Sequence, residues 1–126
     1  MIKIKAGVFA NQRFIESYHT LANNDKLGAA TMQVVRVTKK LIEEHEAFDK
    51  ARGSIYKKYG KEENGQFIIE YNKFTPDQLA SFNSEMDALI GVEITLPIDD
   101  KIKISCKCGL KPIEFILLDD FIEVVE

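Results

Sequence analysis

The sequence predicts an α+β domain, in which a small, mostly antiparallel sheet packs with one long helix and two or three shorter helices. Apolar residues recur at a helical period over about residues 26–59, which predicts the long helix. Several shorter segments alternate apolar and polar residues, the period of a half-buried strand. The length of 126 residues corresponds to a single domain, residues 1–126.

The first elements are a short strand and a helix. Residues 2–6 alternate apolar side chains with Lys3 and Lys5, which predicts a strand with one buried face. Residues 10–22 have the apolar spacing of an amphipathic helix. Asn23, Asn24 and Asp25 end this pattern, because their side chains compete for backbone hydrogen bonds and tolerate turns.

The segment 26–59 contains no proline and has an apolar residue at each position of one heptad row: Leu27, Val34, Leu41, Phe48 and Ile55. A helix of this length would extend about 50 Å. Asp25 is a candidate N-cap and Gly60 a candidate C-terminal stop. Helix 10–22 covers about half of the stripe at most, so the sheet or a second chain must cover the rest. The candidate self-association residues are Val34, Leu41, Phe48 and Ile55.

The second half of the chain alternates between strand and helix signals. A strand is expected over 66–71, and Thr75, Pro76 and Gln78 have the pattern of a capped helix start. The helix that follows carries an apolar stripe made of Leu79, Phe82, Met86 and Leu89.

Two further runs of period two, 92–98 and 102–108, flank a short acidic turn and predict a hairpin with one buried face. A short final helix is expected to begin at Pro112.

Composition restricts the class of protein. The net charge of −3 argues against broad, non-specific nucleic-acid binding, which requires an excess of basic residues. No apolar run approaches the roughly 20 residues that cross a bilayer, and no signal-peptide pattern precedes the first strand, so a cytoplasmic location is expected. Cys106 and Cys108 are spaced neither as a redox pair nor as a zinc knuckle, which argues against a disulfide framework.

The residues that could carry chemistry have simpler structural roles. His19 and His45 fall on different predicted helices, so we expect His45 to be a packed, hydrogen-bonded side chain rather than a metal ligand or base. Cys106 and Cys108 fit small buried side chains on one strand face. The acidic residues at 43–49 have lysines three or four positions away, as on a solvated helix face. We therefore expect the protein to have no enzymatic activity, no cofactor and no metal site.

Lysines form the one charge feature with a functional interpretation. If the first strand and the strand near 102–108 share a sheet, one surface would carry Lys3, Lys5, Lys101, Lys103 and Lys107. Such lysines commonly solubilise a sheet face or protect an edge. The functional alternative is a docking surface for an acidic protein or a phosphate backbone.

The order of these signals resembles a family of small proteins of tailed bacteriophages and prophages whose function is not established. The matching stretches are Ala10-Asn11-Gln12, Lys39-Lys40-Leu41, Phe48–Arg52 continuing to Lys57–Gly60, Asn64-Gly65, Val92–Ile94 and Phe121–Glu123. The chain departs from the family at Gly28, where proline is frequent, and in the basic strand 101–108. The resemblance implies a phage origin and expression in the host bacterial cytoplasm, and it carries over no catalytic residue.

Three functions remain as hypotheses. The first is a non-enzymatic binding protein that acts stoichiometrically on a host or phage protein, as inhibitors of host defence or replication do. The second is a structural or assembly protein that forms a homo-oligomer through the long helix. The third is a nucleic-acid-binding accessory protein that uses the lysine face, which the net charge disfavours.

Overall fold

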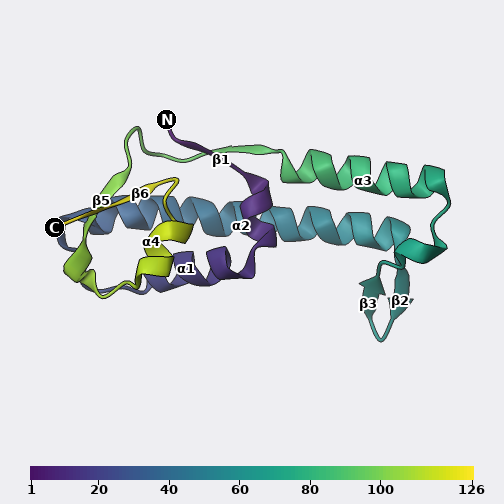
Figure 1. The fold of residues 1–126 in the computed structure, drawn as a ribbon, viewed down its shortest axis with the longest axis horizontal. Helices are drawn as coiled ribbons and strands as arrows, with labels where there is room; N and C mark the ends of the chain where they lie inside the picture. Colours follow the sequence, from purple (N-terminus) through teal and green to yellow (C-terminus); the bar gives the residue numbers. More distant parts are fainter.

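The structure, a computed structural model, describes residues 1–126 and confirms the α+β class with its long helix. Figure 1 shows an elongated molecule in which helix α2 (Thr31–Tyr59) extends from one end almost to the other. Both chain termini, helix α1 (Gln12–Ala22) and helix α4 (Pro112–Leu117) lie along the first half of α2. Helix α3 (Pro76–Ile90) lies beside the second half.

The remaining elements are short. Four 3₁₀ helices connect the longer segments: η1 (Ala6–Ala10), η2 (Gly28–Ala30), η3 (Tyr71–Lys73) and η4 (Cys106–Cys108). The strands are β1 (Lys3–Lys5), β2 (Lys61–Glu63), β3 (Gln66–Ile68), β4 (Glu93–Thr95), β5 (Ile102–Ser105) and β6 (Ile122–Val125).

The strands form three separate two-stranded sheets instead of one. β1 pairs antiparallel with β4, and β2 pairs antiparallel with β3. β5 pairs with β6 in parallel, so the predicted hairpin of 92–98 with 102–108 is wrong. The prediction failed because alternation identifies a strand with one buried face but does not identify its partner. The strand β6, which follows α4, was not anticipated at all.

Helix α2 provides the centre of the hydrophobic core. Its buried side chains Val34, Val37, Leu41 and Phe48 belong to one cluster that also includes residues of α1, η1, β1, β4, β5 and β6. Burying one such side chain contributes about 1.5–3 kcal/mol, so this half of the molecule is a well-packed body. We use the term body for residues 1–48 together with 92–126.

Helix α2 begins later than the sequence suggested. Gly28 has φ of +55°, a left-handed conformation that continues no α-helix, and it is the first residue of η2. The N-cap is therefore Ala30 and not Asp25. The hydroxyl of Thr31 donates to the carbonyl of Gly28 over 2.7 Å and closes the turn. By contrast, α3 begins as expected, with Thr75 and Gln78 forming a capping box and Pro76 in the first turn.

Gly53 within α2 and Gly60 just after it provide a matched pair of stability tests. A Cβ at Gly60, the residue after the last helical turn, would lie 2.5 Å from the carbonyl oxygen of Tyr56 and 3.0 Å from that of Ile68. We expect Gly60→Ala to destabilise the protein by about 1–3 kcal/mol, because two backbone groups must move apart. A Cβ at Gly53 would meet nothing within 4 Å, so Gly53→Ala should stabilise it by up to about 1 kcal/mol through helix propensity. Chemical denaturation of both variants measures this contrast, and equal shifts of the same sign would contradict it.

Candidate functional site: a projecting helical arm

The second half of α2 and the segment that returns along it form a projection with almost no core of its own. We call residues 49–91 the arm; it comprises the end of α2, the hairpin β2–β3, η3 and α3 (Figure 1). Within this range Phe82 is the only buried residue, with 3% of its surface exposed. The segment that follows α2 is therefore held to it by a single fully covered side chain and by partly covered neighbours, and the end of α3 contacts η1 through Ile90 and Gly7.

Aromatic rings surround that anchor. The ring of Phe82 lies 5.6 Å from Tyr59, 6.2 Å from Tyr56, and 5.7 Å from both Tyr71 and Phe74, measured between ring centroids. These separations lie in the range in which aromatic pairs attract one another. Tyr71 nevertheless has 58% of its surface exposed, so one side of the cluster faces solvent.

One ion pair links the two helices of the arm. The ammonium of Lys58 lies 3.1 Å from Glu85 Oε1. The adjacent Tyr59 hydroxyl and Lys58 ammonium lower the pKa of Glu85, and Glu85 in turn raises the pKa of Tyr59. Lys58 is exposed and Glu85 is half-buried, so solvent screens the ion pair and its contribution to stability is small.

Large apolar side chains remain uncovered on the arm. Leu79 has 36%, Ile90 has 38% and Ile68 has 42% of its surface exposed, in addition to Tyr71. The apolar stripe predicted for α3 is present, but only Phe82 of its four residues is buried. The exposure of this stripe depends on the tertiary structure, because α3 packs against α2 and, at its end, against η1, and no other element covers its remaining surface.

The expected lysine face does not form. β1 and β5 belong to different sheets, so Lys3 and Lys5 do not share a sheet with Lys101, Lys103 or Lys107. Acidic residues also accompany the lysines: Lys3 pairs with Glu93 at 3.2 Å, and Lys101 lies 3.7 Å from Asp119. Lys103 stands opposite Glu123 in the β5–β6 register. Lys107 lies in η4 and not on a strand.

The expected self-association stripe is covered within the chain. Val34, Leu41 and Phe48 are buried in the core, and Ile55 is half-buried in the arm. Three of the four predicted self-association residues are therefore covered by the body of the same chain and are not available to a second chain. The apolar residues of α2 that do reach the surface belong to other rows, namely Met32, Val35 and Ile42.

His45 is a packed, hydrogen-bonded histidine, as expected. The hydroxyl of the buried Tyr18 lies 2.7 Å from His45 Nδ1, and His45 Nε2 lies 3.2 Å from Asp49 Oδ2. The ring of Phe9 stacks on the imidazole at 5.2 Å. If Tyr18 donates to Nδ1, the proton on Nε2 points to Asp49, so one tautomer satisfies both contacts. This chain of side chains joins α1 to the middle of α2.

We expect Tyr18→Phe to destabilise the protein by about 1–3 kcal/mol, because Nδ1 of the half-buried imidazole loses its partner. Burial, followed by the charges of Asp49 and Glu46, raises the pKa of Tyr18. The stabilisation from the protonated phenol is complete below the ordinary tyrosine pKa and is lost as pH rises through the raised value. Denaturation curves at neutral and alkaline pH measure both effects. Tyr56→Phe is the control, since its hydroxyl makes no side-chain hydrogen bond; equal losses for the two variants would contradict the assignment.

The cysteines do not face the same side. Cys106 is exposed, Cys108 is buried, and both lie in η4 and not on a strand as predicted. No group of three or more His, Cys, Asp or Glu side chains is arranged to hold a metal ion.

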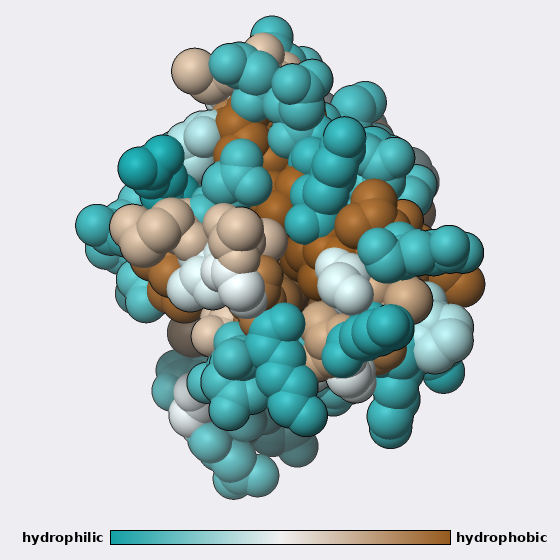
Figure 2. All heavy atoms as spheres, turned by 90° about the vertical axis from the view of Figure 1, so that its left-hand side faces the viewer, coloured by the Kyte–Doolittle hydropathy of each residue, from teal (hydrophilic) through white to brown (hydrophobic).

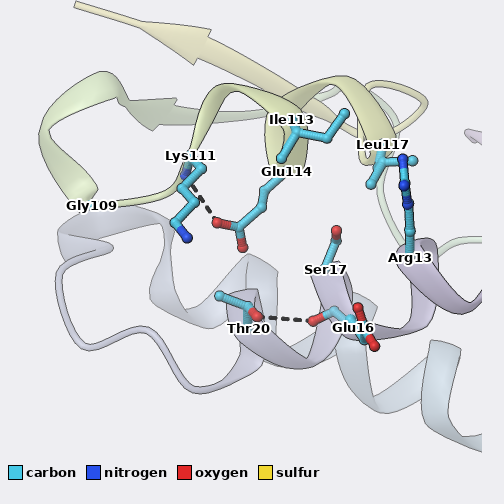
Figure 3. A pocket seen from close by; sticks show the side chains of 9 residues that line it. All are labelled: Arg13, Glu16, Ser17, Thr20, Gly109, Lys111, Ile113, Glu114 and Leu117. Carbon is cyan, nitrogen blue, oxygen red and sulfur yellow. Dashed lines mark hydrogen bonds between the residues drawn. The ribbon is translucent and has the colours of Figure 1, made fainter.

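A shallow groove of about 630 Å³ lies between α1 and α4 (Figure 3). Its lining mixes both charge signs, with Arg13 and Glu16 on α1 facing Lys111 and Glu114 around α4. Glu114 Oε1 accepts a hydrogen bond from the backbone N–H of Lys111, so this carboxylate caps its own helix. No nucleophile paired with a base lines the groove.

The end of the body opposite the arm also exposes apolar surface. Figure 2 shows apolar atoms reaching the surface there, surrounded by hydrophilic side chains. Met32 has 62% of its surface exposed, and Val35 follows one turn later on α2. These two residues give control positions that are remote from the arm in the fold.

Comparison with known proteins adds no relative: no protein-family model matches the chain, and no curated protein or solved structure matches it either. None of the helices combines the length and the apolar character needed to span a membrane.

Proposed function

We propose that this chain is a non-enzymatic binding protein of phage origin that acts stoichiometrically on a host or phage protein in the host bacterial cytoplasm. In this proposal the body is the scaffold and the arm is the docking surface. The observation that carries it is the arm itself, which projects two helices and a hairpin around one buried side chain, Phe82.

Physical considerations favour protein docking by this part of the molecule. Exposed aromatic and apolar residues are typical anchors of protein interfaces, where a few side chains supply most of the binding energy. Tyr71, Ile68 and Leu79 are such residues, and the lysines around the hairpin supply a polar rim. Acidic neighbours beside Lys3, Lys101 and Lys103 disfavour the alternative of phosphate-backbone binding.

The test compares capture of proteins from infected bacterial cells by three forms of the tagged full chain. The arm variant Ile68→Glu/Leu79→Glu is expected to retain its partner at least about tenfold less than the unmodified chain, the loss that one interface hot spot produces. The control variant Met32→Glu/Val35→Glu places the same charges at the opposite end and should retain the partner. Equal capture by all three forms, with unchanged melting temperatures, would remove the arm as the docking surface.

A further inference from the structure

We propose that one protein that docks on the arm is a second copy of this chain, with the outer face of α3 of one molecule packed on the outer face of α2 of the next. This inference rests on the proposed function, because it takes the arm as a protein-docking surface. It names the partner and the two faces that meet.

The two helices of the arm carry opposite charge. Helix α3 contains Asp77, Glu85 and Asp87 and no basic residue. The last part of α2, residues 50–59, contains only basic charges: Lys50, Arg52, Lys57 and Lys58. A protein that contacts both helices must place basic side chains against α3 and acidic side chains against α2. Another copy of the arm carries both kinds of side chain.

Most of these charges are unused within one molecule. Lys58 and Glu85 form the single ion pair between the helices. Lys50, Lys57, Asp77 and Asp87 are exposed and belong to no ion pair. Lys50 and Lys57 lie seven residues apart, which places them on one side of α2. Both lysines therefore remain available to acidic side chains of another molecule.

Small residues lie between the charges and allow the two helices to approach closely. Gly53 and Ser54 separate the two lysines, and a Cβ at Gly53 would meet no atom within 4 Å. Ala80 and Ser84 occupy the corresponding stretch of α3, and all four residues are exposed. Figure 1 shows no other element of the chain above α3. Interaxial distances between packed helices are set by the side chains at the contact, so small residues favour a tight contact.

An antiparallel register brings both charge pairs together. With α3 of one copy running against α2 of the next, Asp77 meets Lys57 while Asp87 meets Lys50. The two aspartates are about 15 Å apart along their helix and the two lysines about 10 Å along theirs, at 1.5 Å per residue. The long lysine side chains span the difference of about one turn. In this register the small residues of the two helices lie between the charge pairs.

In this arrangement each contact joins two different faces, α3 of one molecule and α2 of the next, so the contact is heterologous. A heterologous contact does not close after two molecules but continues into a ring or an open chain of molecules. We therefore expect a mass that rises beyond the dimer as the concentration increases.

The test measures mass against concentration for the full chain and two charge-reversed variants. Lys50→Glu/Lys57→Glu makes the contact face of α2 acidic like that of α3, and Asp77→Lys/Asp87→Lys makes the contact face of α3 basic like that of α2. Each variant alone is expected to associate at least about tenfold more weakly, because like charges now meet. An equal mixture of the two should associate again, since each acidic face then finds a basic one. Lys26→Glu/Lys39→Glu, on exposed lysines outside the arm, is the control and should associate like the unmodified chain.

Two results would overturn the inference. One is a monomeric mass for the unmodified chain up to millimolar concentration, and the other is a mixture no heavier than its separate components. If the arm variant Ile68→Glu/Leu79→Glu still loses a different captured protein, the proposed function stands without self-association. If the arm variants alter neither capture nor mass, both proposals fail.

Discussion

Leu41→Asp is expected to abolish the folded body. Leu41 is fully buried near the middle of α2 and belongs to the core cluster that α2 forms with α1 and the strands. Removing a buried leucine side chain alone costs about 2–5 kcal/mol, and an unpaired buried carboxylate adds to that cost. Since domains of this size are stable by about 5–15 kcal/mol, the substitution removes most or all of the stability.

Thermal unfolding followed by circular dichroism measures this effect. The adjacent residue Ile42 is exposed, so Ile42→Asp makes the same chemical change one position away without entering the core. We expect the cooperative transition to disappear for Leu41→Asp and to move little for Ile42→Asp. A retained transition in Leu41→Asp would show that this row of α2 is not the centre of the core.

Phe82→Ala is expected to release the arm while the body stays folded. The substitution removes the only buried side chain between residues 49 and 91 and four ring contacts, at a cost of about 3–5 kcal/mol. None of the 22 buried residues of the core cluster belongs to the arm, and only the partly buried Leu89 of α3 packs against that cluster, so the body keeps its packing. The expected outcome is local unfolding of the hairpin and α3.

Limited proteolysis shows where the chain opens. We expect new cleavage sites within residues 61–91 of Phe82→Ala and none in α1 or the first half of α2. Phe67→Ala is the matched control, because Phe67 is half-buried and its ring makes no contact with the aromatic cluster. Uniform digestion of Phe82→Ala along the whole chain would indicate that the arm and the body unfold as one unit.

Local signals in the sequence predicted the helices well. The heptad row of α2 and the Thr75, Pro76, Gln78 start of α3 depend on residues within a few positions of one another, and the structure contains both. The start of α2 was misplaced because Asp25 has the chemistry of an N-cap, whereas the left-handed conformation of Gly28 three residues later decides where the helix begins.

Strand pairing could not be predicted in the same way. The runs that became β4 and β5 follow one another in the sequence, yet β4 pairs with β1 and β5 with β6, each a partner distant in sequence. An alternating pattern shows only that one face of the strand is buried. It does not show which neighbouring strand forms the hydrogen bonds along its edge. The predicted lysine surface required the first strand and the 102–108 strand to share a sheet, so this prediction was wrong together with the predicted hairpin.

The exposed apolar surface of the arm could not be predicted from hydrophobic periodicity either. Leu79, Phe82, Met86 and Leu89 have the spacing of a buried stripe, but only Phe82 is fully covered. How much of a stripe is covered depends on how many elements pack against the helix, which is a property of the whole fold. The charge difference between α3 and the end of α2 was visible in the sequence, and its meaning required their antiparallel placement in one arm.

Amide hydrogen exchange of the intact chain tests the central claim, a well-packed body that carries a thinly covered arm. At a concentration where the chain is monomeric, the amides of α3 should exchange faster than those of α1 and of the first half of α2, because less buried surface resists their opening. Addition of a captured partner, or an increase in concentration, should slow exchange in the arm. Protection of α3 equal to that of α1 in the isolated chain, unchanged by any partner, would contradict the account.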